Sequence, residues 1–297
     1  MTSRHHIPPL HLLLALAVMV VWGTNFVVIK LALAHLPPLP GSQAELQAVA
    51  HRFGAARTTL LLLAAYGVLI GAGQFGVLFT AMRGDITPGL ASLVAQVQVF
   101  FTIGLSMRIT GERIATYQIV ALLLATAGLG TILLHTDGSA TPLGIGLTLI
   151  AALSWAVGNM VARAAAPPDK PINMLGYVVW SGLFAVPPLL AFALVMEGPA
   201  RMMAGIAAAD GWTWGAVAWQ AVGNTMFGYA AWGWLLARHP AAQVAPLALL
   251  VPVFGLASSA LLLGEPLQPW KLAAFALVMA GLALGVLWPR FGKGSSR

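Results

Sequence analysis

The sequence predicts an all-α integral membrane protein, built as an inverted repeat of two five-helix halves with a nominal ten helices. The prediction depends on the composition, on a series of long apolar segments and on an internal duplication. Of the 297 residues, 59% are hydrophobic and 8% are charged, whereas soluble proteins carry roughly 25% charged residues. We therefore expect a chain that lies in the lipid bilayer and has no soluble domain.

Charge and cysteine content narrow the possible functions. The formal net charge is +7, but the Lys and Arg residues stand singly in short loops and form no continuous basic face, so we expect no nucleic-acid partner. Cysteine is absent, which excludes disulfides, thiolate nucleophiles and cysteine-bound metals and leaves the redox compartment undetermined. We expect neither a cofactor nor a metal ion.

Nine segments have the length and composition of membrane-crossing helices, which need about 20 predominantly apolar residues. The first is too long for the apolar part of a signal peptide and contains Asn25 and Lys30, so we expect it to be retained. The segment Glu197–Gly211 is expected to be a loop. The nine segments are residues 10–34, Leu60–Met82, Gly89–Met107, Ala115–His135, Leu143–Val161, Met174–Met196, Trp212–Ala237, Ala242–Leu263 and Trp270–Trp288.

The segment Gly41–Thr59 holds the place of a tenth helix, the second in the chain, but it is too polar. Its three strongly apolar residues favour insertion by about 0.3–0.6 kcal/mol each, whereas a central arginine such as Arg52 opposes it by about 2.5–3.5 kcal/mol. We therefore expect a second helix that is atypical or degraded.

An internal duplication defines the two halves. Gly111-Glu112 is followed by Ala127-Gly128-Leu129, and Gly264-Glu265 is followed by Ala280-Gly281-Leu282, at one constant offset of 153 residues. We assign residues 1–138 to the first half and 139–297 to the second. The two copies lie five helices apart, an odd number, so they cross the membrane in opposite directions. Inverted repeats of this kind are common in secondary transporters, where one half moves against the other around a central site.

The distribution of cations predicts the orientation in the membrane. One side would carry eight Lys and Arg residues from Arg108 to Arg297, and the other would carry Arg83, Arg201 and Lys271 with several acidic residues. By the positive-inside rule, the first side and the C-terminus are cytoplasmic.

Polar and aromatic side chains within the apolar segments are the candidate site residues. An unpaired polar group in hydrocarbon is costly, so it is a functional candidate by default, although packing and helix–helix hydrogen bonding are the alternative explanations. Two residues apart on an α-helix means about 200° of rotation, so Gln96 and Gln98 are not both expected to face one cavity. The candidates for substrate binding are Trp22, Asn25, Gln74, Gln96, Gln98, Trp155, Asn159, Trp180, Tyr229 and Trp232, and Asn224 also qualifies.

Two prolines and the two repeat corners are the candidate hinges and gates. Pro246 and Pro252 interrupt an apolar segment and could act as hinges. Glu112 and Glu265 stand at the two equivalent corners and are candidate gate residues.

At these residues the chain resembles the EamA-type family of the drug/metabolite transporter superfamily, and within it the exporters of O-acetylserine and cysteine. The resemblance covers nearly the whole chain. It runs through VVWGTNFVVIK (Val20–Lys30), the Gln74-Phe75 pair, PGLASLVAQVQVFFT (Pro88–Thr102), TGER (Thr110–Arg113), LSWAVGN (Leu153–Asn159), VVWSGL (Val178–Leu183), GYAAWGWLL (Gly228–Leu236) and VAPLALLVPVFGLASSALLLGE (Val244–Glu265). The chain departs from the family pattern at Gly41–Thr59, where only Arg52-Phe53 matches.

The resemblance implies export of small amino-acid metabolites, such as cysteine or O-acetylserine, across the bacterial inner membrane by alternating access. Acidic residues fall outside or at the ends of the nine segments, which leaves no buried carboxylate as a proton carrier and favours a facilitator or exchanger. Export of another small metabolite or drug-like compound and an impaired transporter are alternatives. An intramembrane enzyme is disfavoured because no catalytic cluster stands at one depth, and no selectivity ring indicates a channel. The expected partners are a small-molecule substrate and the lipid bilayer, and the sequence leaves the oligomeric state open.

Overall fold

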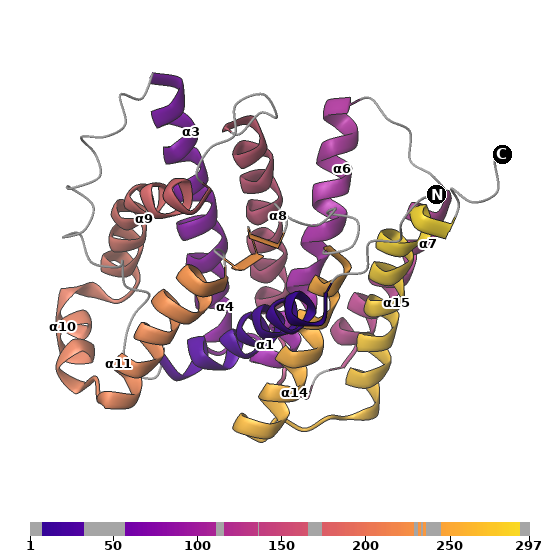
Figure 1. Cartoon of the computed structure of the whole chain (residues 1–297). Coiled ribbons are helices and arrows are strands. Elements are labelled where there is room, and N and C mark those ends of the chain that lie inside the picture. The colour runs from indigo at the N-terminus through magenta and orange to yellow at the C-terminus, as the bar shows by residue number, and fades with distance from the viewer. Residues whose placement is uncertain are drawn as a thin grey trace.

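The structure is a computed structural model that describes residues 8–32, 57–110, 116–135, 137–165, 174–228, 231–232, 234–235 and 245–291. In these ranges the chain forms helices that are assembled into one bundle (Figure 1). Six helical stretches are long and apolar enough to cross a membrane, and two shorter apolar helices follow them. The protein is therefore an all-α membrane protein, as the composition predicted.

Each of the nine predicted segments is helical over its described residues, except for Leu134 and His135 at the end of the fourth segment. In the first half these are α1 (Pro9–Ala32), α3 (Arg57–Gly67), η1 (Val68–Gly76), α4 (Val77–Met82), α5 (Pro88–Val94), η2 (Ala95–Val97), α6 (Gln98–Thr110) and α7 (Thr116–Leu133). In the second half they are α8 (Pro142–Ala165), α9 (Met174–Met196), α11 (Gly211–Ala218), η3 (Trp219–Phe227), η4 (Ala245–Leu250), α14 (Val251–Leu263) and α15 (Pro269–Phe291).

One further helix was not predicted. α10 (Gly198–Ala208) occupies the segment that we expected to be a loop. Eleven residues rise only about 16 Å, too little to cross the hydrocarbon core, and a search for spans of about 20 residues passes over such a helix. Gly198 begins it with a φ of +76°, and the preceding Glu197 forms an ion pair with Arg83 at 2.5 Å.

The segment Gly41–Thr59 lies outside the described residues except for its last three, which begin α3. The atypical second helix therefore stays a prediction.

The packing of α7 against α15 has the reciprocity of a two-fold axis. A Cβ added to Gly128 would lie 2.9 Å from the carbonyl oxygen of Ala274, and one added to Gly281 would lie 2.5 Å from that of Ala121. Gly128 and Gly281 are equivalent at the offset of 153 residues, and so are Ala121 and Ala274. When residue i contacts the equivalent of j, and j contacts the equivalent of i, the two surfaces are related by a two-fold rotation. The inverted repeat is therefore visible in the packing.

The two halves interleave around the same axis. α1 packs against α14 and η3, and the equivalent α8 packs against α6 and η1. The first helix of each half thus packs against the other half. The interior between these crossings is built from both halves.

Four segments that are not α-helical lie at equivalent places in the two halves. η1 and η3 are π-helical, each with nine residues, and η2 and η4 are 3₁₀-helical. Departures of this kind within a helix often mark functional sites. Their symmetric placement makes the region between them the candidate site.

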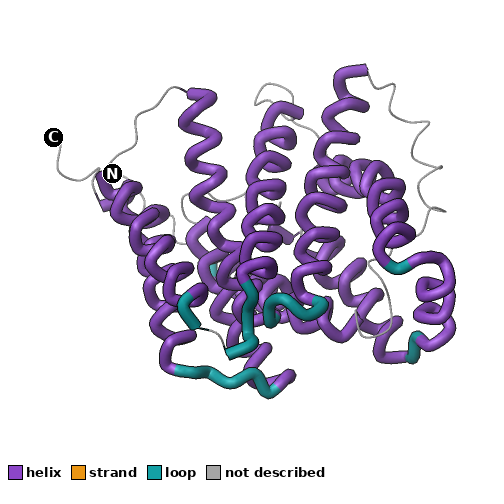
Figure 2. Tube along the Cα trace, turned by 180° about the vertical axis from the view of Figure 1, so that it is seen from behind, coloured by secondary structure: helices purple, strands orange, loops and turns teal. Residues whose placement is uncertain are grey.

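Three of the described loops lie at one end of the bundle (Figure 2). They connect α4 to α5, α7 to α8 and α14 to α15. Gly264 ends α14 in the left-handed conformation, with φ +66°, which glycine adopts without a steric penalty. At this end the Nζ of Lys271 lies 3.9 Å from a carboxylate oxygen of Asp137.

Candidate functional site

A cavity of about 440 Å³ lies between the two halves. Three kinds of element line it: the first helices α1 and α8, the π-helical and 3₁₀ segments, and parts of the spans that contain them. The lining residues are Trp22, Asn25, Phe26, Ile29, Tyr66, Gln74, Phe75, Leu78, Ala95, Gln96, Gln98, Trp155, Asn159, Ala162, Val178, Asn224, Trp232, Ala248 and Val251. The volume suits a small ligand.

The structure brings eight of the ten predicted binding residues to this cavity. The exceptions are Trp180, which is buried but does not line the cavity, and Tyr229, which lies outside the described residues. Phe26, Tyr66 and Phe75 line the cavity and were not among the candidates. Phe26 and Phe75 have no polar group that would distinguish them in the sequence, so only the packing of the helices places them here.

Both Gln96 and Gln98 line the cavity, so the expectation that only one of them faces it was wrong. η2 spans Ala95–Val97 and winds with three residues per turn. Two residues then differ by about 240° instead of about 200°, which brings their side chains closer in direction. The local 3₁₀ turn therefore lets one wall present both amides.

Side chains from the first helices support the two π-helical segments. The indole N–H of Trp22 donates to the carbonyl oxygen of Asn224 in η3 at 3.2 Å, and the hydroxyl of Ser154 donates to that of Leu69 in η1 at 2.9 Å. A π-helix rearranges the backbone ladder, so such cross-bonds help to satisfy its carbonyl groups. The first helix of each half thus hydrogen-bonds to the π-helical segment of the other half.

Two amide oxygens at the cavity have no hydrogen-bond partner. They are Oδ1 of Asn25 and Oε1 of Gln74, and both atoms are buried. A buried acceptor without a donor costs about 1–3 kcal/mol. An incoming N–H or ammonium group would satisfy these oxygens, so the cavity is suited to a hydrogen-bond donor.

The remaining wall is aromatic and uncharged. The rings of Trp22 and Trp232 lie with their centroids 5.5 Å apart, and Trp155, Tyr66 and Phe75 add further aromatic surface. No Lys, Arg, Asp or Glu is among the lining residues that the structure describes. The described residues also contain no group of three His, Asp or Glu side chains that could hold a metal ion. The site is polar, aromatic and neutral.

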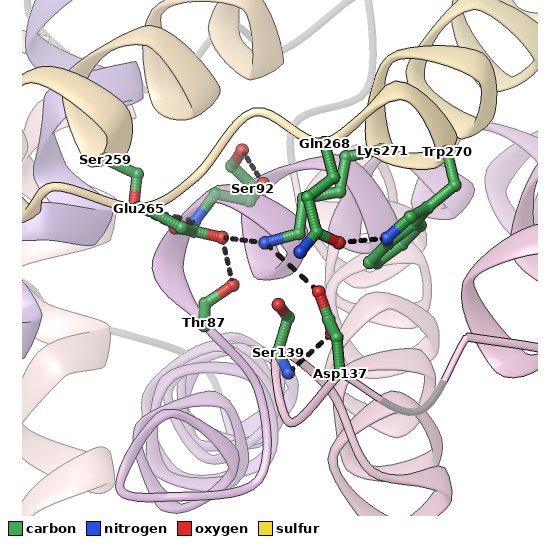
Figure 3. A network of polar contacts seen from close by, with 10 residues as sticks. Thr87, Ser92, Asp137, Ser139, Ser259, Glu265, Gln268, Trp270 and Lys271 are labelled. Atoms are coloured by element: carbon green, nitrogen blue, oxygen red, sulfur yellow. Dashed lines mark hydrogen bonds and ion pairs between the residues drawn. The ribbon is translucent and has the colours of Figure 1, made fainter.

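A second polar cluster, the corner network, lies at the loop end of the bundle (Figure 3). The Glu265 carboxylate accepts hydrogen bonds from the hydroxyls of Thr87 and Ser259 and from the backbone N–H of Gly89 at 3.3 Å. Lys271 has no exposed side-chain surface, and its Nζ lies 3.5 Å from Glu265 and 3.9 Å from Asp137. The network joins the α14–α15 corner of the second half to the N-terminus of α5 in the first.

Glu265 supplies what the N-terminus of α5 lacks. Thr87 is the N-cap of α5 and makes no side-chain capping bond. Buried N–H groups at a helix N-terminus need an acceptor, and an anion there is favoured by the helix dipole. The carboxylate that fulfils both needs comes from the other half, so separating the halves at this end would break the cap.

The sequence-based expectation of no buried carboxylate needs a correction. The Glu265 side chain is only 6% exposed and that of Glu197 only 8%. Both stand at helix ends, as predicted, but the corners fold back against neighbouring helices and cover them. Neither residue lines the cavity.

Asp137 is held in its charged form by its neighbours. Burial would raise the pKa of its carboxyl group, but hydrogen bonds from Ser139 and the nearby ammonium of Lys271 hold that pKa below its ordinary value. Asp137 stands in the loop between α7 and α8, outside the membrane-spanning segments.

The predicted hinge and gate residues occupy different parts of the fold. Pro252 is buried in the first turn of α14, where the chain passes from the 3₁₀ winding of η4 to an α-helix. Pro246 belongs to η4. Glu265 anchors the corner network, and Glu112 lies outside the described residues.

The chain is similar to known proteins that are described as transporters or efflux pumps. Residues 142–287 match the model of the EamA-like transporter family. A protein of Salmonella typhimurium named a probable amino-acid metabolite efflux pump is 41% identical over 279 residues, which cover 92% of this chain and 93% of that protein. An Escherichia coli protein with the same description is 40% identical over 288 residues, which cover 94% and 96% of the two chains. A solved crystal structure with 17% identity aligns over 98% of this chain and all of its own, with a TM-score of 0.54, which supports the fold alone.

Proposed function

Because the chain belongs to the EamA-like transporter family, we propose that it exports small amino-acid metabolites such as cysteine or O-acetylserine. The observation that carries the proposal is the shared cavity with its unpartnered amide oxygens on Asn25 and Gln74. The names of the two relatives from Salmonella typhimurium and Escherichia coli point to the same class of substrate.

The chemistry of the cavity suits a zwitterion. An ammonium group can donate to the two free oxygens of Asn25 and Gln74, and side-chain amides such as those of Gln96 and Gln98 can donate N–H groups to a carboxylate. A neutral lining disfavours ligands of large net charge, because it offers no opposite charge to offset their desolvation. The aromatic surface accommodates a short apolar side chain.

The corner network is the proposed gate at the loop end. Its buried, fully bonded carboxylate closes the interior at this end, and a large apolar cluster that includes Leu78, Met82 and Leu90 packs beside it. The cavity residues of α8 and α3, such as Ala162 and Tyr66, reach toward the opposite end of the bundle. Alternating access would then require Glu265 to leave Thr87 and Gly89.

The charge pattern gives the proposed orientation. The C-terminus is cytoplasmic, residues 1–138 and 139–297 form the moving halves, and the corner network faces the periplasm of a bacterial inner membrane. The cavity then extends toward the cytoplasm, the side from which an exporter takes its substrate. Glu112 would serve the equivalent gate on that side, and Pro246 and Pro252 the hinges.

The cavity lining favours a facilitator or exchanger, because it contains no carboxylate to carry a proton. The aromatic surface around Trp22 and Trp232 is the observation that would favour a bulkier, drug-like substrate instead.

Transport by the purified protein in proteoliposomes tests the proposal. Vesicles loaded with unlabelled cysteine or O-acetylserine are diluted into the radiolabelled compound, and counterflow is followed with and without a pH gradient. We expect counterflow that needs no pH gradient. The proposal is wrong if neither compound is exchanged while a drug-like cation is, and the facilitator mechanism is wrong if exchange is strictly coupled to protons.

A further inference from the structure

The two halves contribute different chemistry to the cavity, although they are copies of one unit. Gln96 and Gln98 in the first half correspond, at the offset of 153 residues, to Leu249 and Val251 in the second. Both glutamines line the cavity, whereas the second-half wall presents Ala248 and Val251. Of the two pseudo-symmetric walls, η2–α6 is therefore polar and η4–α14 is apolar.

The π-helical segments differ in the same sense. Gln74 of η1 lines the cavity with an unpartnered oxygen. At the offset of 153 residues the equivalent residue is Phe227, which is apolar and does not line the cavity. Both unpartnered acceptors of the cavity, Asn25 and Gln74, thus come from the first half.

We propose that the substrate binds in one orientation, with its charged head group against the first half and its side chain against the η4–α14 wall, where Ala248 and Val251 decide which side chains are accepted. The inference depends on the proposed transport of amino-acid metabolites. Its physical basis is that polar groups bind where acceptors and donors are unpaired, whereas an apolar side chain gains most where apolar surface is buried.

The size of the wall residues then sets selectivity. Ala248 has a small side chain, and both Ala248 and Val251 pack in the apolar cluster with Val18, Met19 and Trp22. One methylene more or less in an apolar pocket changes discrimination by about 10-fold or more. Replacing Ala248 by a larger residue should exclude long side chains, and replacing Val251 by a smaller one should admit them.

The test compares Ala248→Leu and Val251→Ala with the matched first-half variant Ala95→Leu, because Ala95 is equivalent to Ala248 and also lines the cavity. Proteoliposomes exchange radiolabelled O-acetylserine, and unlabelled alanine, leucine and phenylalanine compete. We expect Ala248→Leu to weaken competition by leucine and phenylalanine at least about 10-fold relative to alanine, and Val251→Ala to strengthen it. Ala95→Leu should weaken all competitors alike.

The outcomes separate this inference from the proposed function. Unchanged competition ratios in Ala248→Leu and Val251→Ala, with exchange intact, overturn the one-orientation model alone. A side-chain preference that moves with Ala95→Leu overturns it as well. Absence of O-acetylserine and cysteine exchange by the parent protein overturns the proposed function and this inference with it. Purified Val251→Ala protects the test against a folding defect in Ala248→Leu, because removing two methyl groups adds no bulk.

Discussion

The cavity and the corner network are both polar regions in an apolar protein, yet their oxygen acceptors differ in hydrogen bonding. In the cavity, amide oxygens of Asn25 and Gln74 are buried without a partner. In the corner network, the Glu265 carboxylate has three hydrogen-bond donors and a buried ammonium beside it. Unpaired polar atoms are costly unless a ligand completes them, whereas a carboxylate with several donors holds a structure together. The Nζ of Lys271 makes no hydrogen bond and acts on this carboxylate through its charge. The comparison teaches that the hydrogen bonding of the oxygen acceptors, more than their polarity, distinguishes a binding site from a gate.

Removing the buried cation should have the largest effect of any single substitution in this comparison. Lys271→Met leaves Glu265 and Asp137 facing each other without a counter-charge, and breaking a buried pair costs about 3–5 kcal/mol. Thermal unfolding in detergent should show a large decrease in Tm. The control is Lys271→Met combined with Glu265→Gln, which should recover part of the loss. An unchanged Tm in the single variant would show that the network does not hold the fold.

Removing the unpaired amides should leave stability intact and remove transport. In Asn25→Ala and Gln74→Ala the lost amide oxygen has no protein partner, so Tm should stay the same or rise slightly, whereas each lost bond to an ammonium is worth about 1.5–3 kcal/mol of binding. Exchange of O-acetylserine at low concentration should decrease about 10-fold or more. Asn159→Ala in the second half should also lower export, at unchanged membrane abundance.

Trp180→Phe is the control for these variants, because Trp180 is buried but does not line the cavity. It should transport like the parent. If all three amide variants transport like the parent too, the cavity is not the binding site.

Thr87→Val tests the gate with a smaller change. It deletes one hydroxyl that donates to Glu265 across the two halves, a contribution of about 1 kcal/mol to the closed state. We expect the loop end of the bundle, which we propose faces the periplasm, to open more often, measured as a faster reaction of a maleimide with a single cysteine introduced at Leu78. Thr148→Val is a suitable control, because the Thr148 hydroxyl bonds only within α8, to Gly144. Equal labelling rates in Thr87→Val and the parent would show that the corner network does not control opening at this end.

The smallest expected effect is that of acid on the corner network. The pKa of Asp137 is lowered in the folded protein, so its contribution to stability is complete above its ordinary pKa of 3.8 and is lost as the pH falls through the lowered value. Unfolding measured from pH 6 down to about pH 3 should show a decrease that is smaller in Asp137→Asn. An equal decrease in both proteins would place the acid-sensitive group elsewhere.

Much of the fold follows from hydropathy and spacing, because a segment that crosses the membrane must hydrogen-bond its backbone polar groups within a helix and needs a long apolar sequence. The same physics explains why α10 was missed, since a helix that does not cross the membrane has no such length requirement. The binding residues were recognisable where a polar side chain interrupts an apolar segment, as at Asn25 and Gln74. Phe26 and Phe75 give no such signal.

The corner network could not be predicted, because its members come from separate loops. Thr87, Asp137 and Lys271 are each ordinary loop-end residues in the sequence, and only the folding of three loops to one end brings them to Glu265. The pairing of Gln96 with Gln98 on one wall likewise depends on the 3₁₀ turn of η2, which no periodicity in the sequence indicates. Hydropathy indicates neither the local type of helix nor the long-range contacts between loops.

Substrate protection of a single thiol in the cavity tests the central claim most directly. The chain has no cysteine, so Ala95→Cys creates one reporter on the cavity wall. We predict that a membrane-impermeant maleimide labels it from the cytoplasmic side and that O-acetylserine slows the labelling in a saturable manner, whereas lactate at the same concentration does not. Labelling that proceeds at the same rate with and without O-acetylserine, in protein that exchanges O-acetylserine, would contradict the account.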